Sequence, residues 1–454
     1  MGSNPTPSAR SGLQMPKGDI MSEPVRDRGS RSLPTAHVRH GRLRRSRAWK
    51  TIFATIAASM AVVLVSTVSV GAITLAQINS NIDVVKLEVL EGQEERIIPT
   101  VGKWEGGFNV LLVGIDNEPG QADSRDRGSA TLNDVNILIH VAEDQQSAVA
   151  VSIPRDMVVP IPSCPDPDGE GASFAMSAQP INVAWSYGGL NCVVLTVEAL
   201  TGLTIPYAGA ISFNGVAQLS TAVGGVDVCI DGSIKDPYTG LDLSGAGTHT
   251  LVGGTALAFL RTRYGVGDGS DLGRISNQQV YMSSLMRKVQ NEGVLTDVTK
   301  LYGIAVVATS SMKLTESLVS LDTMVSMAQA LRNVPTENIV FVQYPSRTGG
   351  TGVYSGKVQP ITSAATALFE RIRADERFAL EEGNTGRGST LDPNAPAVEP
   401  TPEPTPTEVA VPKNGKIVPE VEPTLEPVAP TEPVEVLPGV EGQTAADRTC
   451  SVSN

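Results

Sequence analysis

The chain has 454 residues and a formal net charge of −13, but these averages conceal segments of very different composition. The first fifty residues are basic, and the remaining chain carries all of the net negative charge. The four histidines and four cysteines are scattered without metal-ligand spacing, which argues against a zinc site. Any bound metal should therefore be a hard cation held by carboxylate and phosphate oxygens.

An uncharged segment follows the basic residues. No charged residue occurs from Thr51 to Ile82, and the apolar stretch 52–75 is long enough to cross about 30 Å of hydrocarbon. We predict a transmembrane helix at 51–77 with residues 1–50 as a cytoplasmic tail, because Lys and Arg favour that side. A cleavable signal peptide is the rival interpretation, but its basic region would run for about fifty residues, and such regions are short. Nucleic-acid binding by the tail is disfavoured, because no helix-turn-helix pattern follows it.

This topology places everything after about residue 78 outside the cytoplasm, anchored to the cell membrane by a single span. All four cysteines lie in the exported part, where an oxidising compartment permits disulfides. Cys164 and Cys192 flank one loop-and-helix segment and are the expected bridge, although four cysteines allow three pairings.

Residues 106–380 alternate short β-branched runs with the spacing of amphipathic helices, which favours an α/β sandwich around a buried sheet. Residues 78–105 are polar and charged, and we predict a stalk. Residues 386–454 are dominated by Pro, Glu, Thr and Val, so we predict a disordered tail. Strands are expected at 109–115, 135–142, 148–153, 205–211, 226–230 and 339–344, and helices at 181–187, 193–200, 216–222, 254–261 and 276–288.

Two carboxylates stand beside the first expected strands. Asp116 ends the run 109–116, and Asp134 begins the second strand, so the sheet could bring them together as oxygen ligands for Mg²⁺. Considered alone, an Asp after a strand is better explained by ordinary turn chemistry.

Arginines cluster further along the chain. Arg155 and Asp156 close the third strand, and Arg261, Arg263 and Arg274 fall within fourteen residues. Arg274 and Gln278 are four residues apart at a helix start and so share one face. Guanidinium groups at a helix N-terminus suit a pyrophosphate. The alternative interpretation is a salt-bridge network with a purely structural role.

In combination and order, these motifs resemble the LytR-CpsA-Psr family over residues 106–290, and the likeness extends to about 375. The resemblance implies a three-layer αβα sandwich with a central mixed sheet. The quoted segments that carry it are 109–116, 152–156, 181–189, 222–226, 253–263 and 271–279.

The resemblance also implies roles for individual residues. Asp116 and Asp134 would coordinate Mg²⁺, or alternatively Mn²⁺, and Asp156 or Asp134 would assist deprotonation of the acceptor hydroxyl. The side chains that hold the pyrophosphate would be Arg155, Arg261, Arg263, Arg274 and Gln278, and the catalytic set would be the four arginines with Asp156.

One departure concerns 132–135, which reads Leu-Asn-Asp-Val where the family usually has Arg-Ser-Asp-Thr. One expected phosphate-binding arginine is therefore absent. Either Arg125 or Arg127 replaces it, or the site tolerates one fewer positive charge. The family also implies an apolar groove for a lipid, which 193–200 and 216–219 would line unless they are ordinary core.

The expected function is a phosphotransferase. It would move a glycopolymer phosphate from a polyprenyl-pyrophosphate carrier to peptidoglycan and release polyprenyl phosphate. Two alternatives remain open: a hydrolase that splits polyprenyl pyrophosphates with water, and a non-catalytic glycopolymer-binding or regulatory membrane protein. Only the enzymes would need the metal pair Asp116 and Asp134.

Overall fold

The computed structural model describes residues 106–116, 131–167, 171–395 and 434–454, together with 84–87 and seven positions between 49 and 60. Residues 1–69 form a unit of their own, in which the described positions are helical and exposed. No helix built from the described residues is long and apolar enough to cross a membrane. The predicted tail 1–50, span 51–77 and stalk 78–105 lie mostly outside the described residues and stay predictions.

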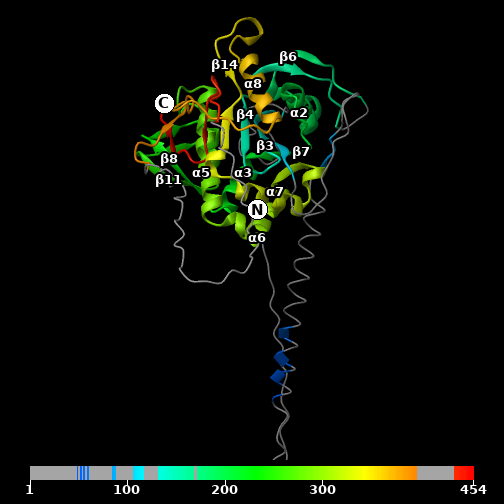
Figure 1. Ribbon diagram of the computed structural model, residues 1–454, viewed down its shortest axis with the longest axis vertical. Coiled ribbons are helices and arrows are strands. Elements are labelled where there is room, and N and C mark those ends of the chain that lie inside the picture. The colour runs from blue at the N-terminus through cyan, green and yellow to red at the C-terminus, as the bar shows by residue number, and fades with distance from the viewer. Residues whose placement is uncertain are drawn as a thin grey trace, which may run out of the picture. The chain divides into compact units, whose positions relative to one another are not determined.

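A mixed eight-stranded sheet forms the centre of the unit 70–454 (Figure 1). The three central strands pair antiparallel, and each outer member of this trio has a parallel neighbour. The prediction of a central mixed sheet is therefore confirmed. In spatial order the strands are β1 (Val84–Val85), β12 (Met312–Thr315), β7 (Tyr207–Ser212), β2 (Phe108–Ile115), β3 (Asn133–Val141), β4 (Ala148–Ile153), β13 (Ile339–Gln343) and β17 (Gly442–Thr444).

Helices cover both faces of this sheet. Successive residues of a strand point to opposite faces, so Leu111 and Val113 of β2 enter one core cluster and Val110 enters another. The first cluster contains side chains of α2 (Trp185–Thr201) and α8 (Thr362–Arg373). The second contains side chains of α5 (Asp271–Asn291) and α7 (Leu321–Ala330), which completes three layers.

The apolar run of α2 is part of this core. Val193, Val194 and Val197 are fully buried against the sheet. Each buried side chain of this size stabilises the fold by roughly 1.5–3 kcal/mol relative to exposure. Of the two interpretations offered by the sequence for 193–200, core packing is the one the structure shows.

A second, four-stranded sheet packs against α5. Its order is β11 (Gly247–Leu251), β8 (Val226–Asp231), β18 (Thr449–Val452) and β16 (Ser389–Leu391). Val280 and Tyr281 of α5 share a core cluster with Val228 and Ile230 of β8. The remaining longer helices are α3 (Phe213–Ala222), α4 (Gly254–Arg261) and α6 (Val298–Ser311).

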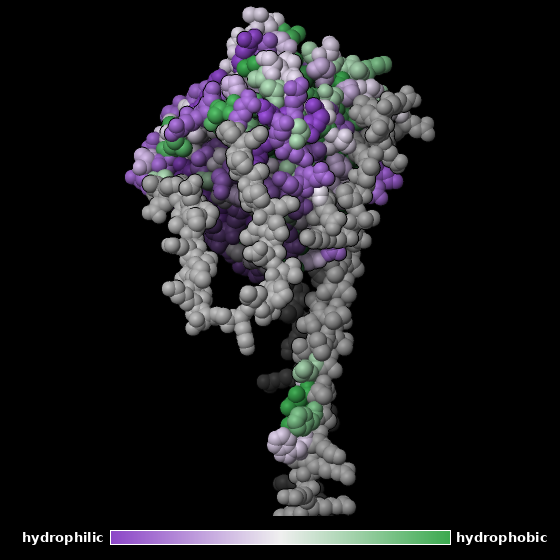
Figure 2. Space-filling view, in the orientation of Figure 1, coloured by the Kyte–Doolittle hydropathy of each residue, from purple (hydrophilic) through white to green (hydrophobic). Residues whose placement is uncertain are grey.

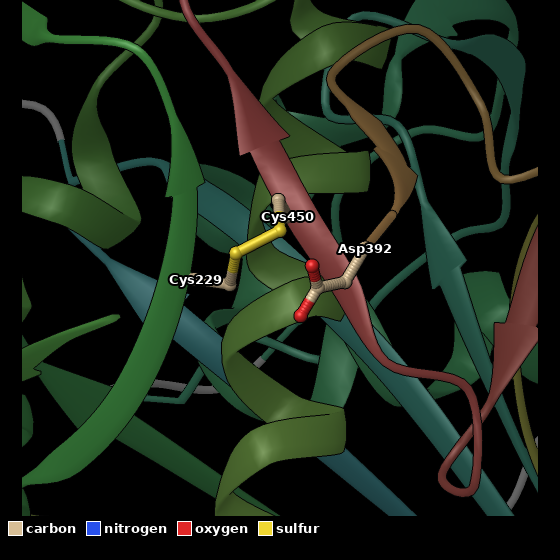
Figure 3. Close-up of side chains that lie close together, drawn as sticks. All are labelled: Cys229, Asp392 and Cys450. Carbon is tan, nitrogen blue, oxygen red and sulfur yellow. A yellow bond between two sulfur atoms is a disulfide. The ribbon is translucent and has the colours of Figure 1, made fainter. Parts of the chain in front are cut away.

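The prediction of a disordered tail over 386–454 is wrong for 386–395 and 434–454. In these parts β16, β17 and β18 pair within the two sheets. A disulfide joins Cys450 of β18 to Cys229 of β8 (Figure 3). Strand pairing and this covalent bond stabilise segments whose composition suggested no core. Residues 396–433 lie outside the described part.

The other two cysteines also pair. The structure contains the bridge predicted between Cys164 and Cys192, whose Cα atoms are 5.2 Å apart. The described surface visible in Figure 2 is mainly hydrophilic, with apolar residues in small separate patches. Three small hairpins complete the fold: β5 (Val158–Ile161) with β6 (Met176–Pro180), β9 (Ile234–Asp236) with β10 (Leu241–Leu243), and β14 (Ser346–Arg347) with β15 (Gln359–Pro360).

Candidate active site

Most of the predicted site residues lie along one edge of the central sheet. β2, β7, β4 and β13 all end at this edge, and β3 begins there, because β3 is antiparallel to β2 and β4. Asp116 follows β2, Asp134 is the second residue of β3, and Arg155 follows β4. Ligands of open α/β sheets bind outside such strand ends.

Two arginines and two aspartates form a buried ion cluster at this edge. Arg155 Nη1 lies 2.8 Å from Asp134 Oδ2, and Arg155 Nε lies 3.5 Å from Asp271 Oδ1. Arg274 Nη2 lies 2.6 Å from the same Asp271 oxygen and also donates to the Asp134 carbonyl at 3.1 Å. Every one of these side chains is at most 15% exposed. Charges this deep are retained only when they are paired.

The carboxylates and burial act in opposite directions on the arginines of the ion cluster. Burial alone would lower the pKa of Arg155, but the carboxylates of Asp134 and Asp271 outweigh burial and raise that pKa. Burial lowers the pKa of Arg274, on which Asp271, Arg155, Asp134 and Arg263 also act. These five groups comprise three guanidinium groups and two carboxylates. Asp156 also acts on Arg155, so three carboxylates stand beside three guanidinium groups. The guanidinium groups suit a phosphate or pyrophosphate through the paired hydrogen bonds that they can donate.

The position of Asp271 follows from its helix. Ser270 caps α5, its hydroxyl accepting the Gly273 N–H, and Asp271 occupies the first turn, where a carboxylate is stabilised by the helix dipole. The sequence placed Asp271 among the arginines but gave it no role. The i, i+3 spacing of Asp271 and Arg274 was the signal that could have paired them.

Asp116 is held by the neighbouring strand. Its Oδ1 accepts the Leu132 N–H at 2.9 Å, and its own N–H donates to the Leu132 carbonyl at 3.3 Å. The register between β2 and β3 shifts between Gly114 and Ile115, which places this pair at a bulge. Asp116 is 5% exposed.

Asn133 stands where the family pattern has serine, and it has a structural role. Its side chain is fully buried and donates to Asn136 Oδ1 and to the Ile181 carbonyl. It also accepts the Trp185 N–H at 3.1 Å, which fastens β3 to the start of α2. The candidate replacements for the absent arginine, Arg125 and Arg127, lie outside the described residues.

Three further predicted residues lie around the α4–α5 connection. Arg261 ends α4, and its guanidinium carbon lies 4.1 Å from the centroid of the Phe213 ring. Arg263 Nε donates to the Gly269 carbonyl at 3.2 Å. Gln278 Nε2 donates to the Leu260 carbonyl at 2.9 Å, so its amide fastens the end of α4 to α5. This contact makes Gln278 a positioning residue for Arg261.

Asp156 connects the ion cluster to a residue that the sequence did not suggest. Its Oδ1 lies 3.1 Å from Lys357 Nζ, and its Oδ2 lies 3.8 Å from Arg155 Nε. Lys357 precedes β15 and is 201 positions away from Asp156, so no local pattern signals the pairing. The described site therefore has a lysine at its edge as well as arginines.

The loop between α4 and α5 is clamped by residues 452–454. Gly267 N–H donates to the Val452 carbonyl at 2.9 Å, and Asn454 N–H donates to the Gly265 carbonyl at 3.2 Å. Asn454 Nδ2 adds a hydrogen bond to the Tyr264 carbonyl at 3.1 Å. This clamp fixes the loop that carries Arg263 and leads into Asp271.

Two observations bear on metal binding. Over the described part of the chain, the one group of three potential ligands is Cys229, Asp392 and Cys450. The two sulfurs are bonded to each other, as Figure 3 shows, so they are not thiolate ligands. Asp116 and Asp134 offer only carboxylate oxygens, a donor set that fits a hard divalent cation.

Two hollows are lined by residues other than those of the ion cluster. One, of about 460 Å³, is at the opposite edge of the sheet, where His140, Val149 and Val340 contribute to its lining. The other, of about 520 Å³, lies in the connection between β14 and β15 and is lined by residues 347–351, Tyr354 and Gln359. Neither lining includes a residue of the ion cluster, so cavity size alone does not identify the buried charges.

Known proteins resemble the chain over this region. Cell wall biosynthesis protein LcpA of Corynebacterium glutamicum is 28% identical over 322 residues, which cover 65% of this chain and 61% of that protein. Polyisoprenyl-teichoic acid–peptidoglycan teichoic acid transferase TagU of Bacillus cereus is 31% identical over 240 residues, 52% of this chain and 68% of that protein. The match spans 44% of a second Corynebacterium glutamicum relative, the probable cell wall biosynthesis protein LcpB.

Solved structures also resemble the chain. TagT of Bacillus subtilis superposes with a TM-score of 0.45 at 22% identity, covering 64% of this chain and 99% of that structure. A LytR-Csp2A-Psr enzyme from Actinomyces oris gives a TM-score of 0.44 at 19% identity, covering 64% of this chain and 96% of that structure. The profile of the LytR_cpsA_psr family matches residues 71–370, well over half of the chain. The chain therefore belongs to the LytR_cpsA_psr family.

Proposed function

We propose that the chain is a phosphotransferase that moves a glycopolymer phosphate from a polyprenyl-pyrophosphate carrier to peptidoglycan. The observation that carries the proposal is the buried ion cluster of Asp134, Arg155, Asp271 and Arg274 at the sheet edge. Family membership supports it, as do the names of relatives such as TagU, a teichoic acid transferase. The substrates of this chain are part of the proposal.

The proposed phosphoryl transfer requires the protein to stabilise charge and does not require a covalent intermediate with the protein. A hydroxyl of the acceptor attacks the phosphorus next to the glycopolymer, and the P–O bond to polyprenyl phosphate breaks. The hydroxyl proton leaves to a base, for which Asp156 is placed beside Arg155. Arg155 and Arg274 offset the growing charge on the leaving phosphate from a buried position, where their effect is strongest.

A divalent cation is part of the same proposal. Asp116 and Asp134 would hold Mg²⁺, or alternatively Mn²⁺, through carboxylate oxygens alone. A cation there would neutralise phosphate charge at the strand end. The carboxylates are positioned by the chain itself, Asp116 through the Leu132 N–H and Asp134 through Arg155.

The proposed location is the outer face of the cell membrane. Its support is the uncharged stretch 52–75 after a basic segment and the two disulfides, which persist in oxidising compartments. There the enzyme would meet both a lipid-carried donor and a wall acceptor.

The test is release of polyprenyl phosphate by the purified full-length chain from a polyprenyl-pyrophosphate-linked saccharide. Reactions contain Mg²⁺ and are run with and without a peptidoglycan oligomer. Arg261→Ala is the site variant. Arg261 contacts Phe213 and is not part of the ion cluster, so its loss leaves the buried ion pairs in place. Arg332→Ala, an exposed arginine far along the chain, is the matched control.

Acceptor-dependent release that Arg261→Ala loses and Arg332→Ala retains would support the transferase. Release at the same rate without acceptor would make the protein a hydrolase. Tight donor binding with no release would make it a non-catalytic binder of wall polymers.

A further inference from the structure

The connection between β14 and β15 is a glycine-rich loop of polar residues. It projects from the part of the domain that carries β14 and α8 (Figure 1). The sequence from Arg347 to Gln359 contains four glycines, two threonines and one tyrosine. Gly349, Gly352 and Gly356 have positive φ values of 84°, 63° and 67°, which residues with a side chain rarely adopt. The chain therefore encodes this loop's shape.

The loop is fastened directly to the strand end that carries the site. Val358 N–H donates to the Asp156 carbonyl at 3.1 Å, and Val158 N–H donates to the Val358 carbonyl at 3.0 Å. Lys357 Nζ adds the ion pair with Asp156 at 3.1 Å. Val358 is buried, whereas most of the loop is exposed. These contacts set one end of the loop beside Arg155.

The hollow of about 520 Å³ lies in this loop and is lined by Arg347, Thr348, Thr351, Tyr354 and Gln359 with two glycines. Its volume falls in the range of about 300–1,000 Å³ that is usual for small-ligand sites. Gln359 Oε1 accepts from Arg347 Nε at 3.3 Å, which orients both side chains. Gly350 permits close packing, because a Cβ there would lie 2.6 Å from Tyr354 Cβ.

The chemistry of this lining suits a neutral polyhydroxylated ligand. Hydroxyl, amide and guanidinium groups can between them donate to and accept from sugar hydroxyls. A tyrosine ring offers a flat apolar face for the C–H groups of a pyranose. A pyrophosphate is better served by the buried arginines, since the hollow contains a single guanidinium.

The chain itself links the hollow to the ion cluster. Gln359 follows Lys357 by two residues, which is about 7 Å along an extended chain. The Lys357 amine in turn contacts Asp156, next to Arg155. A glycan seated in the hollow would therefore contact the loop whose Lys357 amine holds Asp156.

We propose that the β14–β15 loop is the acceptor subsite, which binds the glycan strand of peptidoglycan while the arginines bind the donor's pyrophosphate. The inference rests on the proposed function and adds the location and chemistry of acceptor binding. Lys357 is a positioning residue that couples the loop to Asp156.

The test separates acceptor from donor. The full-length chain is assayed with increasing amounts of a soluble, uncrosslinked peptidoglycan glycan oligomer at saturating donor, and then with increasing donor at fixed acceptor. Tyr354→Ala and Thr351→Ala alter the hollow, Arg347→Ala removes its guanidinium, and Arg332→Ala is the matched exposed-arginine control. Thr351 is exposed, which makes misfolding of that variant the least concern.

The hollow variants should raise the acceptor KM about tenfold, as expected for loss of one or two hydrogen bonds or a ring contact. The donor KM and acceptor-independent release should stay unchanged, as should both constants in Arg332→Ala. An unchanged acceptor KM, or an equal rise in donor KM, would overturn the assignment.

Isothermal calorimetry, in which the oligomer is titrated into the protein, tests this inference separately from the proposed function. If the wild type transfers nothing yet binds the oligomer, and Tyr354→Ala does not bind it, the loop is a glycan site in a protein of different activity. If the wild type transfers normally and the variants bind as tightly as it does, the loop assignment alone is wrong.

Discussion

Arg155 Nη1 lies 2.8 Å from Asp134 Oδ2, so a guanidinium expected to bind phosphate is paired with a carboxylate expected to bind metal. Each charge compensates the other while no substrate is bound. An arriving pyrophosphate and cation would offer each group a new partner of the right sign. The pair of Arg155 and Asp134 therefore stabilises the domain, and each group could exchange its partner for a phosphate or a cation.

The first prediction concerns the stability contributed by this pairing. Asp134→Ala removes the carboxylate nearest to Arg155, at a side chain that is only 10% exposed, and leaves Asp271 as the buried carboxylate shared by Arg155 and Arg274. The free energy of unfolding should fall by roughly 3–5 kcal/mol in urea titrations. Asp242→Ala breaks the exposed pair with Lys235 and should cost under about 1 kcal/mol. Equal losses in the two variants would contradict a buried, compensating role.

The second prediction concerns the metal. A chelator should stop polyprenyl phosphate release, and added Mg²⁺ should restore it. Asp116→Asn keeps the shape of a side chain that accepts the Leu132 N–H but removes its charge, so half-saturating Mg²⁺ should rise at least about tenfold. Asp242→Asn is the matched exposed control. Full activity in chelator would remove Asp116 and Asp134 from any metal role.

The third prediction concerns the disulfides. Cys229 and Cys450 close a loop of 221 residues and Cys164 and Cys192 one of 28, so loop-closure entropy makes the first bridge worth more. Replacing the first pair with serines should cost roughly 3–5 kcal/mol in unfolding free energy, and the second about 3 kcal/mol.

Only the Cys229–Cys450 replacement should also reduce turnover of the still-folded protein, because β18 leads into the clamp on Gly265 and Gly267. Turnover is measured below the unfolding temperature, with the Cys164–Cys192 variant as the comparison. Loss of turnover in both variants to the same degree would argue against a specific link to the α4–α5 loop.

The fourth prediction concerns pH. Burial lowers the pKa of His140 below its ordinary value near 6.5, although Asp375 Oδ1 lies 2.8 Å from its Nε2 and opposes the shift. Below pH 6.5 the unfolded chain binds the proton more readily than the folded one, so stability falls as pH decreases through that value.

His140→Gln should flatten this decline between about pH 7.5 and about pH 5.5, where one group contributes at most about 1.4 kcal/mol per pH unit. The readout is the urea midpoint at each pH. His249→Gln is the comparison, since that histidine is on β11 and its Nε2 donates to the Gly245 backbone carbonyl. Parallel curves for wild type and His140→Gln would refute the role of His140.

Much of the fold could be predicted because its strands are strongly patterned. The expected strand 148–153 and helix 254–261 match β4 and α4 residue for residue, and 226–230 falls one residue short of β8. The helix expected at 276–288 begins at Asp271 in the structure, because the Ser270 cap precedes the first apolar turn. Continuous apolar runs bounded by glycine left little ambiguity.

The parts that could not be predicted depend on long-range partners. β18 has an ordinary polar sequence, Thr449 to Val452, and becomes a strand only between β8 and β16. Lys357 belongs to the site only because it contacts Asp156, which is 201 positions away in the sequence. Gln278 was expected to face a ligand, yet its amide donates to the Leu260 carbonyl, a partner that helix spacing alone does not reveal.

The clamp formed by residues 452–454 has a consequence for how the protein is made. Pairing of Cys450 with Cys229 has high contact order, so it must form late, after a large entropic cost of loop closure. The α4–α5 loop cannot gain its hydrogen bonds to Val452 and Asn454 until those residues have been synthesised and delivered beside it. A chain interrupted before residue 449 would carry every arginine of the site and still lack the support that holds them in register.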